Sequence, residues 1–485
     1  MTITRRDFVG MAAGGVLTPG SPASTAWAQQ RAGGVGPVMA RLSAYMADAA
    51  TRPLAPEVME HTKHHLLDTI GAMVSGSQLA PGKAAVAYAR AHAGPGRATI
   101  ATSTLRCTAA EAALVNGVMA HSDETDDSHN ESRSHPGCSV VPAALAAGEE
   151  LGASGDRLLR AVALGYDVGT RVVMAMGGAE FSYTSSLATH SIAGNFGAAA
   201  AAACIAGLNP TQMRWVLDYA SQQSSGIVAW RRDTDHIEKA FVFAGMPARN
   251  GVTSALVVHA GWNGVDDVFS GADNFFQAYA PKGVPQRVVD MLGERFEIVQ
   301  TDIKKWTVGS PIQAPLDAIE LIRSKRPFDA GEVRRVFVRV APSVGAVVDN
   351  REIPDISLQH MVAVMLLDRT ASFHAAHDKA RMQDAAVLRE RAKVQLVPDE
   401  ELARLLPVRV TVVDIEFVDG TRVSERVTAV RGTPRNPMSR REIADKARDL
   451  IAPVLGAPVA DRLIAAMYGL EALRDVSELR PLLQR

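Results

Sequence analysis

The chain has 485 residues, of which 47% are hydrophobic and 21% are charged, and its formal net charge is −1. This length predicts two domains rather than one core, and the composition is typical of a soluble globular enzyme. The near-zero charge offers no basic field for nucleic acid, and three widely spaced cysteines argue against disulfide, structural zinc or iron–sulfur frameworks.

The N-terminal segment has the features of an export signal. Arg5-Arg6 precedes a weakly apolar, glycine- and alanine-rich run over 9–17, and Ala26-Trp27-Ala28 follows. A charged region, an apolar region and a small-x-small pattern in this order are typical of a signal peptide, and the run is shorter than a membrane span. The paired arginines predict a twin-arginine signal over 1–28 and a periplasmic, membrane-free mature protein. The alternative is a disordered basic N-terminus.

Helical patterns dominate the chain from residue 36 to residue 277. Apolar residues recur at helical spacing in the segments 53–77, 143–150, 158–175 and 192–205. The alanine run at 198–203 has too few β-branched residues for a strand, and its small side chains favour close helix–helix packing. We therefore expect a buried helical bundle in this part of the chain.

A dense polar segment follows the apolar helical run at 109–120. Residues 121–137 contain three histidines and three aspartates and end in His-Pro-Gly. Imidazoles beside carboxylates can accept protons, donate protons or hold a hard metal ion. The pair Asp126-Asp127 can also serve only to cap a helix or turn. The segment is a candidate functional site, and the residues alone leave these readings open.

The pattern changes near residue 278. Residues 333–340 alternate between apolar and charged types, and 408–430 has two strand patterns around Asp419-Gly420, a hairpin signal. Helical stretches at 315–324 and 356–367 lie between them. A capping box at 439–442 then opens a last helical section. These boundaries predict an α+β domain over 278–436, inserted between helical parts at 36–277 and 437–485.

Five sequence blocks resemble the MmgE/PrpD family, which includes 2-methylcitrate dehydratase, cis-aconitate decarboxylase and iminodisuccinate epimerase. The signature H-x-x-D-[FY]-D-D-T, followed by H-P-G, corresponds to residues 121–128 and 135–137. The other blocks are, in family order, 64–71, 190–198, Lys239 with 245–251, and Lys304 with Trp306 and Leu316-Asp317. Each block alone is weak, but five in the same order over nearly the whole chain are specific.

The resemblance implies a fold and a chemistry. The fold is mainly α with an α+β part: a large all-helical domain from both chain ends and a smaller inserted lid, usually in a homodimer. The shared chemistry removes a proton from carbon next to a carboxylate, without a metal or organic cofactor. Such a weak carbon acid needs a base, fixed positive charge for the developing dianion and an acid for the leaving group.

The resemblance also assigns site residues, by position in this chain. The expected catalytic residues are Glu124, Ser128, His135, His190, Lys239 and Lys304. His135 would act as base or acid with Glu124 beside it, Ser128 would donate a hydrogen bond, and the two lysines would hold substrate carboxylates. The expected substrate-binding residues are Asp127, His129, Arg351 and His360. No metal ligand is assigned.

This chain departs from the family pattern at several of these positions. Glu124 stands where the family has Asp, Ser128 where it has Thr, and His360 where it has Tyr. The K-x-Y-P-S-C-x-x-x-H block, which begins at Lys304, has lost its Cys and its His. These positions line or support the substrate site in the family, so the substrate is left open.

The predicted function is a lyase for a small polycarboxylate, with dehydration of a 2-methylcitrate-like hydroxy acid as the leading reaction. Decarboxylation and epimerisation of a related di- or tricarboxylate begin from the same residues and are the alternatives. A periplasmic organic-acid binding protein without catalysis is the remote alternative. The only partners expected are the small-molecule substrate and a second copy of the chain.

Overall fold

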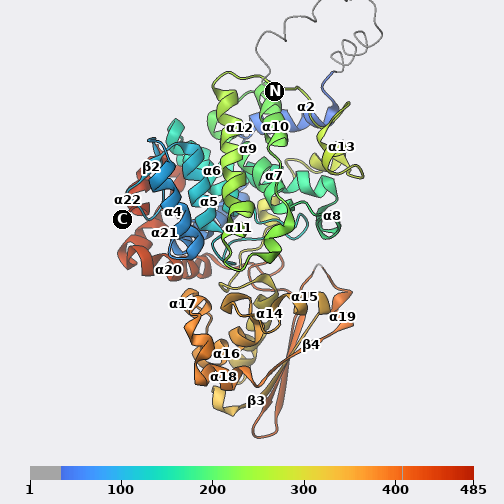
Figure 1. The fold of residues 1–485 in the computed structure, drawn as a ribbon, viewed down its shortest axis with the longest axis vertical. Helices are drawn as coiled ribbons and strands as arrows, with labels where there is room; N and C mark the ends of the chain where they lie inside the picture. Colours follow the sequence, from blue (N-terminus) through green and yellow to red (C-terminus); the bar gives the residue numbers. More distant parts are fainter. Residues whose placement is uncertain (1–33, 407) are drawn as a thin grey trace, which may run out of the picture.

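The computed structural model describes residues 34–406 and 408–485, and the predicted signal segment lies outside these residues. Within them the chain forms a large helical body and a smaller mixed domain at one end of that body (Figure 1). The mainly helical fold with an α+β part is therefore confirmed.

The helical body is built from two separate parts of the chain. The first part contains α2 (Pro37–Asp48), α3 (Pro56–Gly76), α4 (Ala80–His92), α5 (Ala109–Ala120), α6 (Gly137–Leu151), α7 (Gly155–Met176), α8 (Gly178–Thr184), α9 (Thr189–Ala206), α10 (Pro210–Gln222), α11 (Ile237–Ala240), α12 (Met246–His259) and α13 (Phe275–Tyr279), with the short strands β1 (Ala98–Thr99) and β2 (Arg106–Cys107). The second part contains α20 (Arg440–Leu455), α21 (Ala457–Tyr468) and α22 (Arg480–Leu483). Helix α20 packs against α3, which joins the second part to the first.

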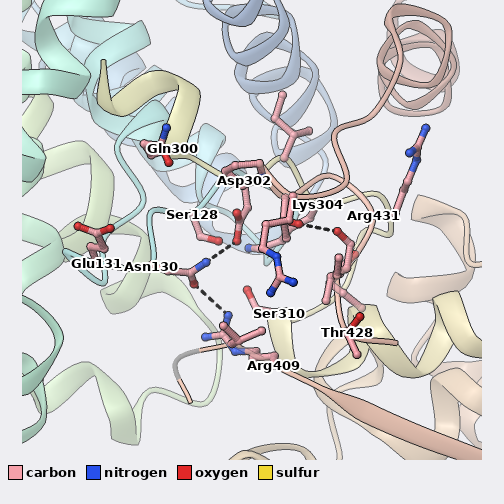
Figure 2. A pocket seen from close by; sticks show the side chains of 18 residues that line it. Ser128, Asn130, Glu131, Gln300, Asp302, Lys304, Ser310, Arg409, Thr428 and Arg431 are labelled. Carbon is pink, nitrogen blue, oxygen red and sulfur yellow. Dashed lines mark hydrogen bonds between the residues drawn. The ribbon is translucent and has the colours of Figure 1, made fainter. Parts of the chain in front are cut away.

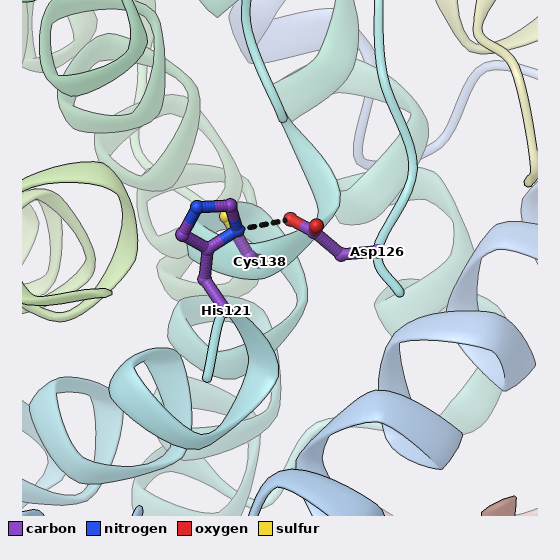
Figure 3. A group of neighbouring side chains, drawn as sticks. All are labelled: His121, Asp126 and Cys138. Atoms are coloured by element: carbon purple, nitrogen blue, oxygen red, sulfur yellow. Dashed lines mark hydrogen bonds and ion pairs between the residues drawn. The ribbon is translucent and has the colours of Figure 1, made fainter. Parts of the chain in front are cut away.

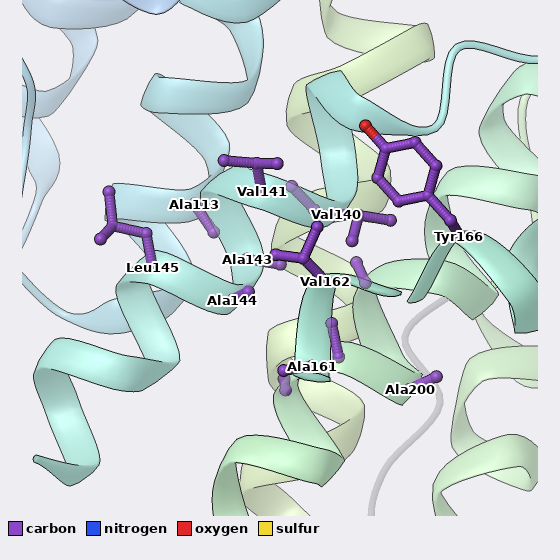
Figure 4. Close-up of a cluster of buried hydrophobic side chains, with 14 of the residues drawn as sticks. Ala113, Val140, Val141, Ala143, Ala144, Leu145, Ala161, Val162, Tyr166 and Ala200 are labelled. Carbon is purple, nitrogen blue, oxygen red and sulfur yellow. The ribbon is translucent and has the colours of Figure 1, made fainter. Parts of the chain in front are cut away.

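Small side chains form the centre of the body. Helix α9, with its alanine run, packs against α6, α7 and α12, and the alanines and valines at this junction are fully buried (Figure 4). Gly169 of α7 shows how close the helices lie, because a Cβ there would be 2.2 Å from the carbonyl oxygen of Ala193. The alanine run therefore packs as predicted, in a buried bundle with close helix–helix contacts.

The smaller domain, called the lid below, is a four-stranded sheet with helices on it. Its elements are α14 (Ser310–Lys325), β3 (Val333–Val340), α15 (Pro342–Val348), α16 (Leu358–Asp368), α17 (Phe373–His377), α18 (Ala385–Arg391), β4 (Val394–Pro398), α19 (Glu400–Ala403), β5 (Thr411–Phe417) and β6 (Arg422–Val427). The strand order is β4-β3-β5-β6, with β4 parallel to β3 and the other pairs antiparallel. The predicted hairpin is β5-β6, whereas β4 was not predicted.

The lid begins later than the sequence predicts. Apolar residues up to Ile303, including Ala280 and Ile298, belong to the hydrophobic core of the helical body. The separate core of the lid starts at Trp306 and extends to Val427. The predicted start at residue 278 is thus wrong by about 25 residues, because this segment has little regular structure but packs with the helices.

One described stretch, Ile237–His259, is long and apolar enough to cross a membrane. Its apolar window is 72% buried inside the protein, where α12 packs against α5 and α9. Such burial is what a core helix of a folded domain shows.

Candidate active site

The dense polar segment forms a buried loop between α5 and α6. His121 ends α5, and Gly137 opens α6. The backbone N–H of Gly137 donates a 3.0 Å hydrogen bond to Oδ1 of Asp127, and a Cβ at this glycine would lie 2.6 Å from the hydroxyl oxygen of Tyr166. Only glycine lets the start of α6 come so close to the loop, which explains the His-Pro-Gly sequence.

Asp127 anchors this loop and does not line the cavity described below. Its Oδ2 lies 2.8 Å from Nδ1 of His65 in α3 and accepts a short hydrogen bond from the hydroxyl of Tyr166 in α7. The side chain is fully buried. The structure therefore corrects the predicted substrate contact, because both carboxylate oxygens are already used by the protein.

Asp126 is the charged centre of the loop. Its Oδ2 lies 2.9 Å from Nδ1 of His121, and its Oδ1 lies 3.3 Å from Nδ1 of His135 and 3.7 Å from Nζ of Lys304. Burial disfavours the charge, but the two imidazoles hold the pKa of Asp126 well below its usual value. One carboxylate thus orients two imidazoles and faces a lysine.

Glu124 lies between the two predicted lysines. It forms a close ion pair with Lys239 of α11, while Nζ of Lys304 lies 4.0 Å from its Oε2 and donates a 2.7 Å hydrogen bond to its backbone carbonyl. Burial opposes ionisation, but the positive charges of the lysines hold the pKa of Glu124 well below its usual value. The site therefore contains a fixed cluster of opposite charges.

An aromatic wall stands beside these charges. Phe243 lies in a π-helical turn, η2 (Phe241–Gly245), between α11 and α12, and such turns occur often at functional sites. The ring of His190 stacks on Phe243 at a centroid distance of 3.9 Å, and that of His121 stacks on it at 4.7 Å. His135 lies 5.4 Å from His190, between ring centroids. Three imidazoles thus gather around one phenyl ring.

Two of these imidazoles are neutral in this setting. Burial and the positive charges nearby hold the pKa of His190 well below its usual value. Burial also lowers the pKa of His121, against the opposing effect of Asp126. Neutral imidazoles can accept protons, and they keep this wall much less polar than the lysine side.

His236 is a site residue that the sequence analysis missed. Its ring centroid lies 5.2 Å from that of His121, and it lines the same cavity as Glu124 and Lys239. Its φ of 62° is strained for a residue with a side chain, at a cost of about 1–3 kcal/mol. The only sequence signal was its position three residues before Lys239, which places it on the first turn with that lysine.

Part of this cluster lines a cavity of about 800 Å³ between the helical body and the lid, whereas Lys304 lines a smaller cavity described below. The body contributes Glu124, His190, His236 and Lys239. The lid contributes residues from the α15–α16 connection and α17, among them Arg351, Asp355 and His377. Arg351, a predicted substrate-binding residue, therefore lines the cavity, and its side chain is exposed.

A buried ion pair joins the lid to the polar loop. Nε2 of His377, at the end of α17, lies 2.9 Å from Oδ2 of Asp123. Burial disfavours the charged imidazole, but its hydrogen bond to Asp123 and the charge of that group raise the pKa of His377 to about 9. The pair is therefore charged at neutral pH, and it links the lid to the segment that carries Glu124 and Asp126.

Three further predicted residues lie outside this cavity. His129 is buried between Ser132, at 2.8 Å, and Glu297, at 3.2 Å. His360 is buried in the lid core, where burial lowers its pKa to about 4. Ser128 pairs through its backbone with Asp302. The predicted site roles of these three side chains are therefore wrong. His129 and Ser128 lie in a tight loop in which neighbouring side chains point in different directions, and α16 places His360 in the core of the lid.

Ser128 instead lines a second cavity, of about 260 Å³, on another side of Lys304 (Figure 2). There Asn130 donates a 2.7 Å hydrogen bond to Asp302, and Arg409 of the lid donates one of 3.3 Å to Asn130. Burial raises the pKa of Asp302 to about 6. This cavity lies at the junction of body and lid and lacks the imidazoles of the first.

One group of side chains has the proximity of a metal site. His121, Asp126 and Cys138 place ligand-type atoms within 4.8 Å of one another (Figure 3). However, burial and the charge of Asp126 raise the pKa of the Cys138 thiol well above its usual value. A cysteine binds metal as its thiolate, so a protonated Cys138 does not fit a resident metal ion.

The fold and the site together define a class of protein. A helical body and a lid enclose a cavity lined by a lysine, an ionised glutamate and imidazoles with lowered pKa values, and a second lysine lies beside that glutamate. This combination suits an acid–base enzyme that binds an anionic substrate and moves a proton on it.

Comparison with known families confirms this class. The MmgE/PrpD N-terminal domain model matches residues 40–287, and the MmgE/PrpD C-terminal domain model matches residues 306–471. The chain therefore belongs to the MmgE/PrpD family, as the five sequence blocks predict. It is an enzyme, a lyase of this family.

Curated relatives are similar over nearly their whole length. Cis-aconitate decarboxylase of Aspergillus terreus is 25% identical over 479 residues, which cover 92% of this chain and 96% of the relative. Cis-aconitate decarboxylase of Homo sapiens is 25% identical over 450 residues, covering 89% and 91%. A cis-aconitate decarboxylase-like protein, oryM, of Aspergillus oryzae is 24% identical over 481 residues.

Proposed function

We propose that the chain is a lyase for a small polycarboxylate and that its central step is proton transfer at a carbon next to a carboxylate. One observation carries this proposal: Lys239, the ionised Glu124 and the imidazoles of His190 and His236 line one cavity, and Nζ of Lys304 lies 4.0 Å from Oε2 of that glutamate. Lys239 and Lys304 would bind substrate carboxylates, which would replace Glu124 as the partner of these lysines when the substrate enters.

Decarboxylation of an unsaturated tricarboxylate, of the cis-aconitate kind, is the reaction that we place first. A substrate carboxylate that packs against Phe243 and His190 would lose its hydration, and this desolvation favours its departure as neutral carbon dioxide. The electron pair of the broken bond would stay on the carbon chain and spread toward the carboxylate held by the lysines. His135, with Asp126 beside it to stabilise the imidazolium, would then protonate the carbon. The names of the relatives support this order.

Dehydration of a 2-methylcitrate-like hydroxy acid is the second candidate. His135 lies 3.3 Å from Asp126, and a carboxylate at this distance orients the imidazole that would take the carbon-bound proton. Loss of hydroxide would follow, with a nearby acid supplying the proton for water. Epimerisation would use the same base and a second acid on the opposite face.

One measurement separates these reactions. Cis-aconitate, 2-methylcitrate and other citrate-, malate- and aspartate-type acids are incubated with the enzyme in deuterated buffer and followed by NMR. Loss of a carboxyl carbon with one deuterium gained supports decarboxylation, whereas a new alkene without carbon loss supports dehydration. If no acid reacts or exchanges an α-hydrogen, the proton-transfer proposal is wrong.

We also propose that the mature enzyme is a periplasmic homodimer, exported by the twin-arginine route. The family match begins at residue 40, so the arginine pair lies outside the catalytic part of the chain. Replacing Arg5-Arg6 by lysines should block export, and cell fractionation measures this. Light scattering of the purified protein should give the mass of a dimer. Unchanged export, or a monomer mass, would contradict the respective proposal.

A further inference from the structure

An acid on the lid faces the candidate active site and has no role in the chemistry above. Asp355 lies in a short 3-10 turn, η6 (Pro354–Ile356), and lines the cavity that also holds Glu124 and Lys239. The residue is only 4% exposed. Its backbone carbonyl accepts a 3.0 Å hydrogen bond from Gly309, which fixes the turn in the lid.

The surroundings of Asp355 are unfavourable for a negative charge. Glu124 and Asp123 face it from the polar loop, and no ion pair or hydrogen bond of its carboxyl is found among the residues that the structure describes. The positive groups that face it, His377 and Lys239, are both paired with those acids. Burial therefore dominates and raises the pKa of Asp355 to about 7.

The elements that pack against the turn bring no other counter-charge. These elements are α16 and α17. On α16, His360 is buried with a lowered pKa, and Asp368 at the end of the helix is paired with Arg381. On α17, His377 is bound to Asp123. Arg351 and Lys379 of the lid line the same cavity, and among the described residues neither forms an ion pair with Asp355.

A polycarboxylate substrate in this cavity would bring further negative charge close to Asp355. An ionised Asp355 would repel the substrate across a site of low polarity, whereas a protonated carboxyl is a hydrogen-bond donor to a carboxylate. We propose that Asp355 is a substrate-binding residue that donates its O–H to a substrate carboxylate, so that closing the lid on the substrate takes up one proton. This inference rests on the proposed function for the substrate class, but not on which bond the enzyme breaks.

His377 is the positioning residue for this contact. Its ion pair with Asp123 fixes the end of α17, and α17 packs against the turn that carries Asp355. Loss of the pair would leave the acid at the cavity but hold it there less firmly. We therefore expect His377→Gln to weaken ligand binding without removing the proton uptake that accompanies it.

The test uses tricarballylate, a saturated tricarboxylate with no double bond and no hydroxyl group to eliminate. Binding to the full-length mature enzyme is measured by calorimetry in buffers of different ionisation enthalpy, from pH 6 to 8.5. The wild type should take up close to one proton per ligand at pH 8, and its affinity should fall nearly tenfold per pH unit above 7.

Two substitutions at the same position separate the roles of the carboxyl. Asp355→Asn keeps a hydrogen-bond donor but cannot titrate, so its affinity should stay within a few-fold of the wild type at pH 6 and become independent of pH. Asp355→Ala removes the donor and should weaken binding about 10- to 100-fold. Glu352→Gln, three residues earlier on the exposed lid surface, is the matched control and should behave like the wild type.

The outcomes are distinct. If Asp355→Asn shows the same proton uptake and pH dependence as the wild type, another group titrates and the inference is wrong. It is also wrong if Asp355→Ala, checked for folding by circular dichroism, binds as tightly as the wild type. If the wild type binds no tricarboxylate at any pH, it is the proposed substrate class that fails.

Discussion

The sharpest prediction concerns Asp126, because this one carboxylate faces two imidazoles and a lysine. Asp126→Asn keeps the shape and one oxygen but removes the charge. The residue is fully buried, and Nζ of Lys304 lies 3.7 Å from its Oδ1. Two unit charges at this separation attract by about 4 kcal/mol at an effective dielectric constant near 20.

Both activity and stability should respond to this change. A buried carboxylate that orients a catalytic imidazole can contribute up to about 10⁴-fold to kcat, so we expect a loss of about 10²- to 10⁴-fold. Removing one partner of a buried charge pair costs about 3–5 kcal/mol, so the melting temperature should fall by several degrees. Turnover is followed by NMR on the best polycarboxylate, and unfolding by calorimetry.

A matched control is available at the neighbouring cavity. Asp302→Asn also neutralises a buried acid near Lys304, but one that is hydrogen-bonded to Asn130 on the other side. It should keep turnover within a few-fold of the wild type. If folded Asp126→Asn keeps kcat within tenfold of the wild type, Asp126 does not organise the site and the assignment of His135 loses its support.

Three further predictions follow from the same contacts. His135→Ala should abolish measurable turnover while the protein stays folded; retained activity would place the proton-transfer group elsewhere. Gly137→Ala brings a Cβ to 2.6 Å from the Tyr166 hydroxyl and should cost about 1–3 kcal/mol in urea unfolding, and an unchanged midpoint would contradict this close approach. His377→Gln removes a group whose pKa is raised from 6.5 to about 9, so the stability it contributes, up to about 3 kcal/mol, is complete below pH 6.5 and disappears as pH rises through 9. Unfolding measured at pH 6 and pH 10 should therefore differ between wild type and variant only at the lower pH.

Local patterns predicted most of the fold. Strand β3 occupies the predicted residues, because alternation of apolar and charged side chains marks a sheet with one buried face. The capping box at Ser439 opens α20 as predicted, because capping depends on side chains three residues apart. In both cases the residues that decide the structure are neighbours in sequence.

Where distant residues decide the structure, the sequence was less informative. Strand β4 is a five-residue segment that pairs in parallel with β3, and only that partner makes it a strand. The segment before Ile303 joins the helical core through packing, although its own pattern resembles the irregular stretches of the lid. The sequence therefore predicted the mainly helical fold with an α+β part, but not the residue at which the lid begins.

The active-site residues also divide into those that local motifs predict and those that only contacts between distant residues bring into place. Family motifs drew attention to His135, Glu124 and the two lysines, and the structure brings them to one cavity and its wall. His236 and Asp355 belong to no such motif and enter the cavity only through a strained turn and through the docking of the lid. Contacts between body and lid join residues more than two hundred positions apart, which no local pattern contains.

The polar loop explains how one short segment can serve both substrate chemistry and lid position. Its four acids at positions 123, 124, 126 and 127 have different sets of partners: His377 of the lid, the two lysines, the imidazoles of His121 and His135 together with Lys304, and the anchor formed by His65 and Tyr166. A shift of the loop by one residue would exchange all four sets of partners. Asp123, which pairs with His377 of the lid, directly precedes Glu124, which pairs with Lys239, so the contact with the lid bears directly on the position of Glu124.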